Sequence, residues 1–439
     1  MSTPTTGSST EASPTPPSED HPEEQTKHGP SGQAALLRQV ASSPAVVGLL
    51  AVLTALILSS ILILAADSEV RYTATYLLNR PGDFLHATAS TLSEAYSSLL
   101  RGAVFDWRAT TGVRMIRPIT DTLTNATPLI IAGLGMAVAF RAGLFNIGGQ
   151  GQMILGAITA CYVGIAWNLP PVAHLLLAVV GAALGGLVWG GIAGVLKART
   201  GANEVIVTIM LNSIAAHLLS QVLSLKAFNG EGETGNRKSL TVADTAQYPW
   251  LAGDSFRLHA GFLLALLVAV AVWWLMERSR LGFQLRATGL NSDAARTAGM
   301  SVPWVTSLVM MISGALCGLA ATAPVLGTQK SMDESVVGTI GFDAITVALL
   351  GRSRPLGTVL AGLLFGALRA GGTAMQAAPG THIKIVLVLQ STIVLFIAAP
   401  PLIRAIFRLP ERRDTLGGTA PSPASVPAAA PAAPAAKEA

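Results

Sequence analysis

The sequence predicts an all-α membrane protein that crosses the bilayer with about ten helices. Of its 439 residues, 51% are hydrophobic and only 12% are charged, a balance typical of multi-span membrane proteins and not of soluble domains. The hydrophobic residues also gather in runs close to the twenty residues that a helix needs to cross a bilayer. The formal net charge of +5 is scattered between these runs, so nucleic-acid binding is not indicated.

Both ends of the chain differ from this apolar middle. Residues 1–43 are rich in Ser, Thr, Pro and Glu and should form a disordered cytoplasmic tail. The first apolar run begins too late for a cleaved signal peptide. Residues 406–439 are rich in Pro and Ala and predict a second disordered cytoplasmic tail. The transmembrane domain is therefore expected at residues 44–405.

The apolar runs define ten predicted spans. They are residues 44–66, 119–140, 146–167, 172–196, 203–226, 259–276, 303–324, 337–351, 355–371 and 383–402. An even number places both termini on one side of the membrane. That side should be the cytoplasm, because the short connections on it carry most of the Arg and Lys residues near span ends. We expect a multi-pass protein of the cell membrane.

One segment departs from this charge rule. Residues 67–118, placed outside, hold six arginines, namely Arg71, Arg80, Arg101, Arg108, Arg114 and Arg117. Within this segment, residues 84–100 repeat apolar side chains at near-helical spacing. They predict an amphipathic helix on the outer surface.

The most distinctive polar segment is the inner loop at residues 277–302, which lies between two apolar spans. Its four arginines close to span ends place it in the cytoplasm. Its second half predicts a short helix. Asn291 would be the N-cap, Asp293 would lie in the first turn, and Gly299 could end the helix.

This short helix has the features of a docking element. Ala294, Ala295 and Ala298 should share one face, where small side chains let another protein approach closely. Arg296 would project as a fixed charge. The alternative is an ordinary amphipathic loop between two membrane helices.

A second segment lies where one apolar span ends and the next begins. The run that ends at Arg141 is followed by a glycine-rich stretch with the amides Asn146, Gln150 and Gln152. Such backbone is tolerated at membrane depth where it lines protein or a wet cavity. We expect Asn146 and Gln150, four residues apart, to share a helix face toward a translocation path. A cytoplasmic turn whose glycines allow tight packing is the alternative.

A third segment places polar residues on an apolar helix. Glu204, Thr208 and Asn212 recur every four residues, just after Asn203. An acid in a span is costly enough to be a functional candidate. All four are candidate path residues, of which Asn212 lies deepest. Alternatively, Glu204 reaches the interface or pairs with Arg199 or Lys197.

Small residues indicate how the helices pack. Glycines recur at about four-residue spacing at positions 181, 185, 186, 190 and 194, and again at Gly362 and Gly366. Such spacing favours close helix contacts. Cys161 and Cys317 lie in apolar spans, so they predict buried small hydrophobic residues and neither a disulfide framework nor a metal cluster.

Three strings together resemble a known family. They are G-L-F-N-I-G-G-Q-G-Q-M-I-L-G-A, G-A-N-E-V-I-V-T-I-M-L-N and G-L-N-S-D-A-A-R-T-A-G-M. In this order they resemble the permease subunits of bacterial ATP-binding-cassette (ABC) importers of the sugar, nucleoside and vitamin B12-like type, over roughly residues 45–405. The similarity is greatest to purine nucleoside permeases. Gln150 departs from the family pattern, which typically has an acid there.

The resemblance implies a mechanism and partners. Two permease chains, expected to form a heterodimer, would enclose one path. An extracellular lipid-anchored binding protein would deliver a nucleoside, or alternatively a simple sugar such as ribose or galactose. Residues 291–299, together with Arg286, would couple the permease to a cytoplasmic ATPase.

The chain itself should not be an enzyme. It has no G-x-x-x-x-G-K-[ST] string, so ATP and Mg²⁺ must be bound by the partner ATPase and no cofactor is expected in this chain. An ion-coupled secondary transporter is the less favoured alternative. It predicts intramembrane acids or histidines, and we find only Glu204, His174 and His217 as candidates. A membrane enzyme would need paired carboxylates or a metal cluster.

Overall fold

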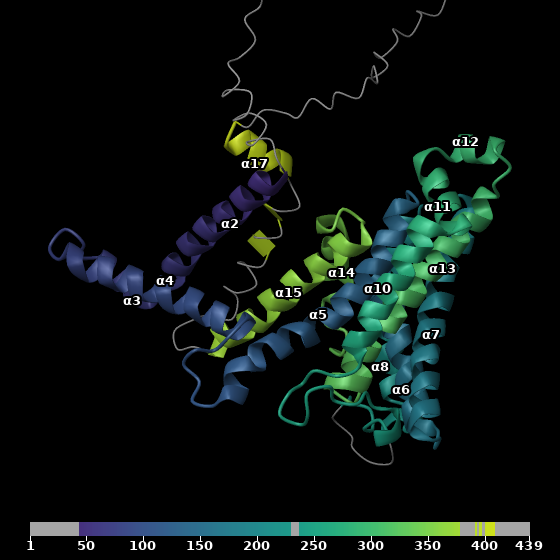
Figure 1. Cartoon of the computed structure of the whole chain (residues 1–439), viewed down its shortest axis with the longest axis horizontal. Helices are drawn as coiled ribbons and strands as arrows, with labels where there is room; N and C mark the ends of the chain where they lie inside the picture. The colour runs from purple at the N-terminus through teal and green to yellow at the C-terminus, as the bar shows by residue number, and fades with distance from the viewer. Residues whose placement is uncertain (1–43, 230–236, 378–390, 393–394, 397–399, 409–439) are drawn as a thin grey trace, which may run out of the picture. The chain divides into compact units, whose positions relative to one another are not determined.

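The computed structural model describes residues 44–229, 237–377, 391–392, 395–396 and 400–408. The chain divides into two compact units, residues 1–47 with 408–439 and residues 48–407. The second unit contains nearly all described residues; only residues 44–47 and 408 belong to the first. Figure 1 shows the labelled helices of the chain.

The described part of the second unit is almost entirely helical. Apart from two isolated β-bridges, it contains α-helices, one 3₁₀ turn and one π-helix. In chain order the elements are α2 (Pro44–Ala66), α3 (Ser68–Ala74), α4 (Pro81–Ala103), α5 (Gly112–Arg141), α6 (Gly149–Ala166), α7 (Pro171–Thr200), α8 (Glu204–Leu223), α9 (Lys226–Asn229), η1 (Asp244–Ala246), α10 (Gly261–Arg278), α11 (Arg280–Leu290), α12 (Ser292–Thr297), α13 (Val302–Ala320), η2 (Ala323–Thr328), α14 (Ile340–Leu350), α15 (Pro355–Ala377) and α17 (Pro400–Ile406).

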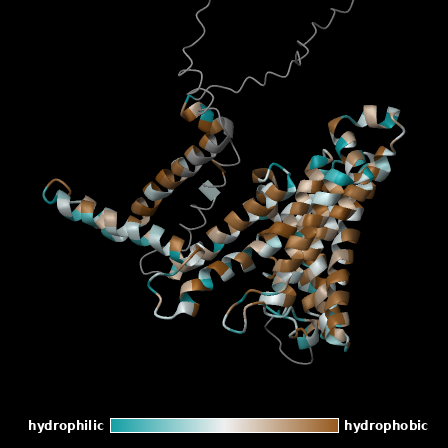
Figure 2. Ribbon diagram, viewed as in Figure 1, coloured by the Kyte–Doolittle hydropathy of each residue, from teal (hydrophilic) through white to brown (hydrophobic). Residues whose placement is uncertain are grey.

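Six of these helices are long and apolar enough to cross a membrane, namely α5, α7, α8, α10, α13 continued by η2, and α15. The segment from residue 53 to residue 74 would be a seventh span if its two helices, bent by 78°, are counted as one. The predicted spans at 146–167 and 337–351 are the helices α6 and α14. The predicted span at 383–402 lies mostly outside the described residues, so the total of ten stays a prediction. Figure 2 shows hydrophobic residues along the helices of the bundle and hydrophilic ones around α11 and α12.

Helices α5 and α13 form the centre of the bundle. Helix α5 packs against α10, α13, α14 and α15, while α13 packs mainly against α7. Glycines allow the α7–α13 contact, because a Cβ built on Gly186 would lie 2.1 Å from the carbonyl oxygen of Gly314. Likewise, a Cβ on Gly366 would lie 2.6 Å from the carbonyl oxygen of Thr122 on α5. The predicted packing role of the glycines at these positions is confirmed.

The predicted helix at residues 84–100 is confirmed as part of α4, but its environment differs from the expectation. One face of α4 packs against α15. A Cβ built on Gly102 would lie 2.2 Å from the Cβ of Ala374 and 3.0 Å from the Cα of Gly371. The helix therefore covers the end of α15, because its small side chains permit close contact there.

Candidate functional site

The short helix of the inner loop forms as its sequence indicates. The side chain of Asn291 accepts hydrogen bonds from the backbone N–H groups of Asp293 and Ala294, both at 3.0 Å. Gly299, with φ of +82°, adopts the left-handed conformation that ends the chain's helical path. The N-cap, the first-turn acid and the glycine stop are confirmed. Helix α11, which precedes this helix, was not predicted.

The alanines of α12 do not share one exposed face. Ala295 is only 3% exposed, while Ala294, Arg296 and Ala298 are exposed. Helix α12 contacts α11 and α13 of its own chain, and a short helix needs one buried side to hold its position. The expected shared face of the three alanines is therefore wrong, because the side chain of Ala295 anchors α12 to the bundle. The part of Ala295 in coupling stays a prediction.

Helix α11 is tied to the transmembrane helices by Glu277 at the end of α10. Its Oε1 lies 3.2 Å from Nη1 of Arg141, and its Oε2 lies 3.0 Å from Nη1 of Arg286. Arg141, the last residue of α5, also donates from Nε to the carbonyl oxygen of Ser353 at 3.1 Å. Arg286 was predicted to take part in coupling and Glu277 was not, although an acid just before two arginines at a span end was a readable signal.

Backbone contact strengthens this connection. A Cβ built on Gly289 of α11 would lie only 2.5 Å from the carbonyl oxygen of Arg141. On the other side, Gly143 has φ of +72°, and a Cβ built on it would lie 3.2 Å from the Cα of Gly289. Helix α11 is thus seated directly on the end of α5, so a displacement of α11 would reach α5 and α10.

Residues 142–148, between the end of α5 and the start of α6, form the broken segment. A buried pair of amide side chains, Asn146 and Gln152, holds this segment in place. Asn146 is fully buried. Its Nδ2 donates to Oε1 of Gln152 at 3.0 Å and to Oγ of Ser313 at 2.8 Å, and its Oδ1 accepts from the N–H of Gly148 at 2.9 Å. Helix α6 begins only at Gly149. The expectation that Asn146 and Gln150 share a helix face is therefore wrong, because Asn146 lies before the helix and pairs with Gln152.

The other amides fasten this break to neighbouring elements. Gln150 donates from Nε2 to the carbonyl oxygen of Gly338 at 2.7 Å and accepts from the N–H of Gly341 at 3.2 Å. Asn212 of α8 accepts from the N–H of Gly151 at 2.8 Å and donates to the carbonyl oxygen of Ile147 at 3.0 Å. Asn212 thus satisfies backbone groups that the interrupted helix leaves without partners.

The remaining predicted path residues also have local partners. Asn203 caps α8 by accepting from the N–H of Val205 at 2.9 Å. Thr208 is fully buried and donates to the carbonyl oxygen of Glu204 at 2.7 Å. Glu204 forms an ion pair with Lys197, which confirms the alternative interpretation of this acid. Their role in a path stays a prediction.

A polar cavity of about 220 Å³ lies between α5, η2, α14 and α15. Its lining includes the side chains of Asn125, Gln329 and Arg369. Arg369 forms an ion pair with Asp343 and donates to Oγ1 of Thr339 at 2.8 Å. Asp343 and Arg369 were not among the predicted site residues, although charged residues inside predicted spans are functional candidates by default.

The histidines and cysteines that the sequence singled out are mostly structural. His174 is fully buried, with Nδ1 2.7 Å from Oγ1 of Thr245 and Nε2 3.0 Å from the carbonyl oxygen of Val163. Cys161 and Cys317 are free and buried, as predicted. His217, in contrast, is exposed on α8. Within the described ranges, no group of three His, Cys, Asp or Glu residues could hold a metal ion.

Comparison with known proteins identifies the family. A family model described as a branched-chain amino acid transport system permease component matches residues 119–398. The chain belongs to this permease family. The match begins inside α5 and includes the broken segment, the inner loop and α15, so the geometry above is that of a membrane permease.

Individual relatives agree with this assignment. The permease is 40% identical over 291 residues to the guanosine ABC transporter permease NupP of Bacillus subtilis, which covers 66% of this chain and 83% of the relative. It is 36% identical to the glucose ABC transporter permease TsgB13 of Haloferax volcanii, covering 70% and 82%. It is 33% identical to the nucleoside ABC transporter permease NupB of Lactococcus lactis, covering 64% and 79%. The predicted resemblance to ABC transporter permeases is confirmed. All three relatives are named as permease proteins of ABC transporters.

Proposed function

We propose that this permease forms the translocation path of an ATP-driven importer of nucleosides. The observation that carries the cargo assignment is the 40% identity to a guanosine permease over 83% of that relative. The permease of L. lactis with 33% identity, also named for nucleosides, adds support. A glucose permease at 36% identity makes simple sugars the second candidate.

The path would run along the uncovered face of α8. Ser213, His217 and Gln221 are four residues apart, so they share a helix face, and all three are exposed in the single chain. Hydroxyl, imidazole and amide groups can exchange hydrogen bonds with an uncharged polar solute without trapping it by charge. The seven residues predicted from the sequence would support this face from behind, because Asn212 and Thr208 fix α8 against the broken segment.

Movement of the path would be driven through α12. The exposed residues Asp293, Ala294 and Arg296 would contact a separate cytoplasmic ATPase, which would bind ATP and Mg²⁺. The contacts of Arg286 and Gly289 would pass the displacement to α10 and α5. A second permease chain would close the path, and an extracellular binding lipoprotein would deliver the cargo. Both termini would lie in the cytoplasm.

Uptake by the reconstituted complex tests the cargo. The permease is purified with its co-expressed partners, placed in liposomes with ATP inside or outside as orientation requires, and given labelled guanosine. We expect excess unlabelled adenosine or uridine to compete, and excess glucose or ribose not to compete. Competition by glucose alone would overturn the nucleoside assignment in favour of the sugar alternative.

A further inference from the structure

The polar cavity of about 220 Å³ lies far from the coupling side of the bundle. Asn125 of α5 lines it, and this residue lies about 24 Å before Arg141 along the helix, at about 1.5 Å per residue. The inner loop is seated at Arg141, so the cavity lies toward the outer end of α5. Four of its lining residues are exposed, namely Thr328, Gln329, Ser335 and Gly338. The cavity therefore opens along the connection between η2 and α14.

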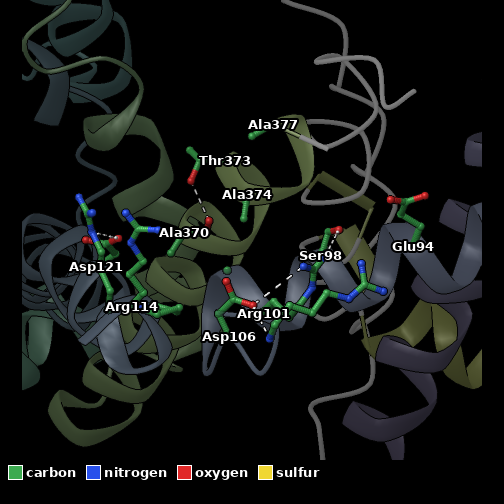
Figure 3. A pocket seen from close by; sticks show the side chains of 14 residues that line it. Glu94, Ser98, Arg101, Asp106, Arg114, Asp121, Ala370, Thr373, Ala374 and Ala377 are labelled. Carbon is green, nitrogen blue, oxygen red and sulfur yellow. Dashed lines mark hydrogen bonds and ion pairs between the residues drawn. The ribbon is translucent and has the colours of Figure 1, made fainter. Parts of the chain in front are cut away.

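A larger cavity, of about 730 Å³, lies between α4, the start of α5 and the end of α15 (Figure 3). Seven charged side chains line it, including the pairs Arg101 with Asp106 and Arg117 with Asp121. Among the described residues that line the smaller cavity, Arg369 alone is charged, and it is paired with an aspartate. Charged groups lose strong hydration when an uncharged solute covers them. An uncharged polar cargo therefore fits the smaller cavity better.

Three side chains that line the smaller cavity keep hydrogen-bonding groups open. Nδ2 of Asn125 donates to a backbone carbonyl of α5 at 2.8 Å, but its Oδ1 accepts from no described residue. Arg369 uses Nη2 for both Thr339 and Asp343, so Nε and Nη1 have no described partner. None of these three atoms is a buried unpaired atom, so each keeps accessible surface. Gln329 is exposed, and its amide also bonds to no described residue.

The packing of α5 on α15 brings these groups together. A Cβ built on Gly366 of α15 would lie 2.7 Å from the backbone nitrogen of Ala126. Asn125 directly precedes Ala126, and Arg369 lies one turn after Gly366, so both side chains leave the two helices at this contact. The cavity has room for about seven water molecules at about 30 Å³ each. A ligand that fills so small a space meets Gln329 as well.

A sugar ring with two neighbouring hydroxyl groups matches this lining. Each hydroxyl donates one hydrogen bond and accepts others, and the cavity offers an acceptor on Asn125, donors on Arg369 and both on Gln329. Apolar residues complete the lining and suit the C–H groups of the ring, namely Pro128, Pro324, Val336, Val337 and Ile340. The volume suits a sugar ring and leaves no room for a base beside it.

We infer that this cavity binds the ribose of the cargo as it enters, through hydrogen bonds from its two neighbouring hydroxyl groups to Asn125, Gln329 and Arg369. The inference rests on the proposed function, because it takes the cargo to be a nucleoside. The base stays outside the cavity, toward α8. Glu334, between lining residues of the same connection, accepts a hydrogen bond from Ser220 of α8 at 2.9 Å. The opening of the cavity is thus joined to the helix that carries the polar face.

Uptake by the reconstituted complex tests this site with a pair of substrates. The value of kcat/KM is measured for guanosine and for 2′,3′-dideoxyguanosine, and their ratio is compared between the unmodified complex and Gln329→Leu. We expect the unmodified complex to prefer guanosine, and the preference to fall by about fivefold in the variant, the value of one hydrogen bond. Asn125→Ala should lower it by a similar factor. The same binding protein serves every complex, so its own preference cancels.

A matched control makes the same exchange outside the cavity. Gln221→Leu, on the face of α8, should slow the uptake of both nucleosides and leave their ratio unchanged. The amide of Gln329 bonds to no described residue, so Gln329→Leu should fold, and elution as a monodisperse complex checks this.

The other outcomes separate this inference from the proposed function. An unchanged ratio in Gln329→Leu overturns the inference and leaves nucleoside import intact. An equal fall in Gln221→Leu would place the ribose on α8 and overturn the inference as well. If the unmodified complex takes up no nucleoside, the proposed function is refuted and this inference with it.

Discussion

Helices α5 and α8 are both long enough to cross a membrane, yet the chain covers them very differently. The most apolar window of α5 is 83% buried within the single chain, whereas that of α8 is only 17% buried. Helix α5 packs against four other helices, and these contacts stabilise the fold. The outer face of α8, with its line of polar side chains, must meet lipid, solute or another chain. Substitutions in the covered region should therefore change stability, and those on the uncovered face should change transport.

The largest effect is expected in the covered region, at the contact of α7 with α13. A Cβ on Gly318 would lie 2.2 Å from the carbonyl oxygen of Ala182. We expect Gly318→Ala to destabilise the fold by about 3 kcal/mol, the upper end for overpacking, because a contact against backbone cannot relax by a rotamer change. The matched control is Gly181→Ala, whose Cβ would have its nearest atom at 3.5 Å. Equal yields of monodisperse protein for both variants would contradict the prediction that the α7–α13 contact excludes a side chain at position 318.

The next largest effect concerns the buried amide pair. Asn146→Ala leaves Gln152 and Ser313 without their shared partner, which should cost about 2–3 kcal/mol. Gln221→Ala, on the uncovered face of α8, should leave the unfolding temperature in detergent unchanged. Thermal unfolding followed by fluorescence distinguishes the two. A similar decrease for both variants would mean that α8 is as firmly packed as the broken segment.

The free energy of unfolding should also depend on pH, by a similar amount, through His259. This residue lies just before α10 and is buried. Burial lowers its pKa to about 4, below the value of the unfolded chain. The folded state then keeps this ring neutral while the unfolded state takes up a proton, so stability is lost as the pH falls from about 6.5 toward 4. The loss by pH 5 should be on the order of 2 kcal/mol.

Comparison with His259→Gln measures this contribution. The unfolding temperature of the unmodified chain should fall more between pH 7.5 and pH 5 than that of the variant. Parallel slopes would show that His259 is not kept neutral by the fold.

The smallest effect on stability, and a selective effect on transport, is expected at His217. His217→Leu should leave unfolding unchanged but lower kcat/KM for nucleoside uptake by about fivefold, the value of one hydrogen bond of about 1 kcal/mol. Ile214→Leu, an apolar exchange on the exposed side of α8, is the control. Unchanged uptake in His217→Leu would place the path elsewhere.

Local sequence signals predicted the local structure well. The cap of α12 by Asn291 and its end at Gly299 depend on neighbours within a few residues, and both formed as expected. Contacts between distant segments were not readable in the same way. The pairing of Asn146 with Ser313, the burial of Ala295 against its own chain and the ion pair of Arg369 with Asp343 all depend on which helices become neighbours. Periodicity alone does not determine that choice.

The spans show the same limit. Apolar length located α5, α7, α8, α10, α13 and α15 to within a few residues at most ends, although α5 begins seven residues before its predicted span. The length of an apolar run does not indicate which of these helices will be buried by other helices of the chain. The polar stripe of Glu204, Thr208 and Asn212 was readable from spacing, but its direction toward the broken segment follows only from the packing of α8 on α6. The uncovered stripe beside it was therefore missed.

The central claim is that a separate ATPase drives this permease through the exposed side of α12. The most direct measurement compares ATP-dependent guanosine uptake by the reconstituted complex carrying Ala294→Glu with that carrying Thr200→Glu, an exposed residue at the end of α7. We predict that Ala294→Glu abolishes uptake and the ATP hydrolysis stimulated by loaded binding protein, while Thr200→Glu keeps both. Full uptake by Ala294→Glu, or uptake by the permease in liposomes that contain no ATPase, would contradict the account.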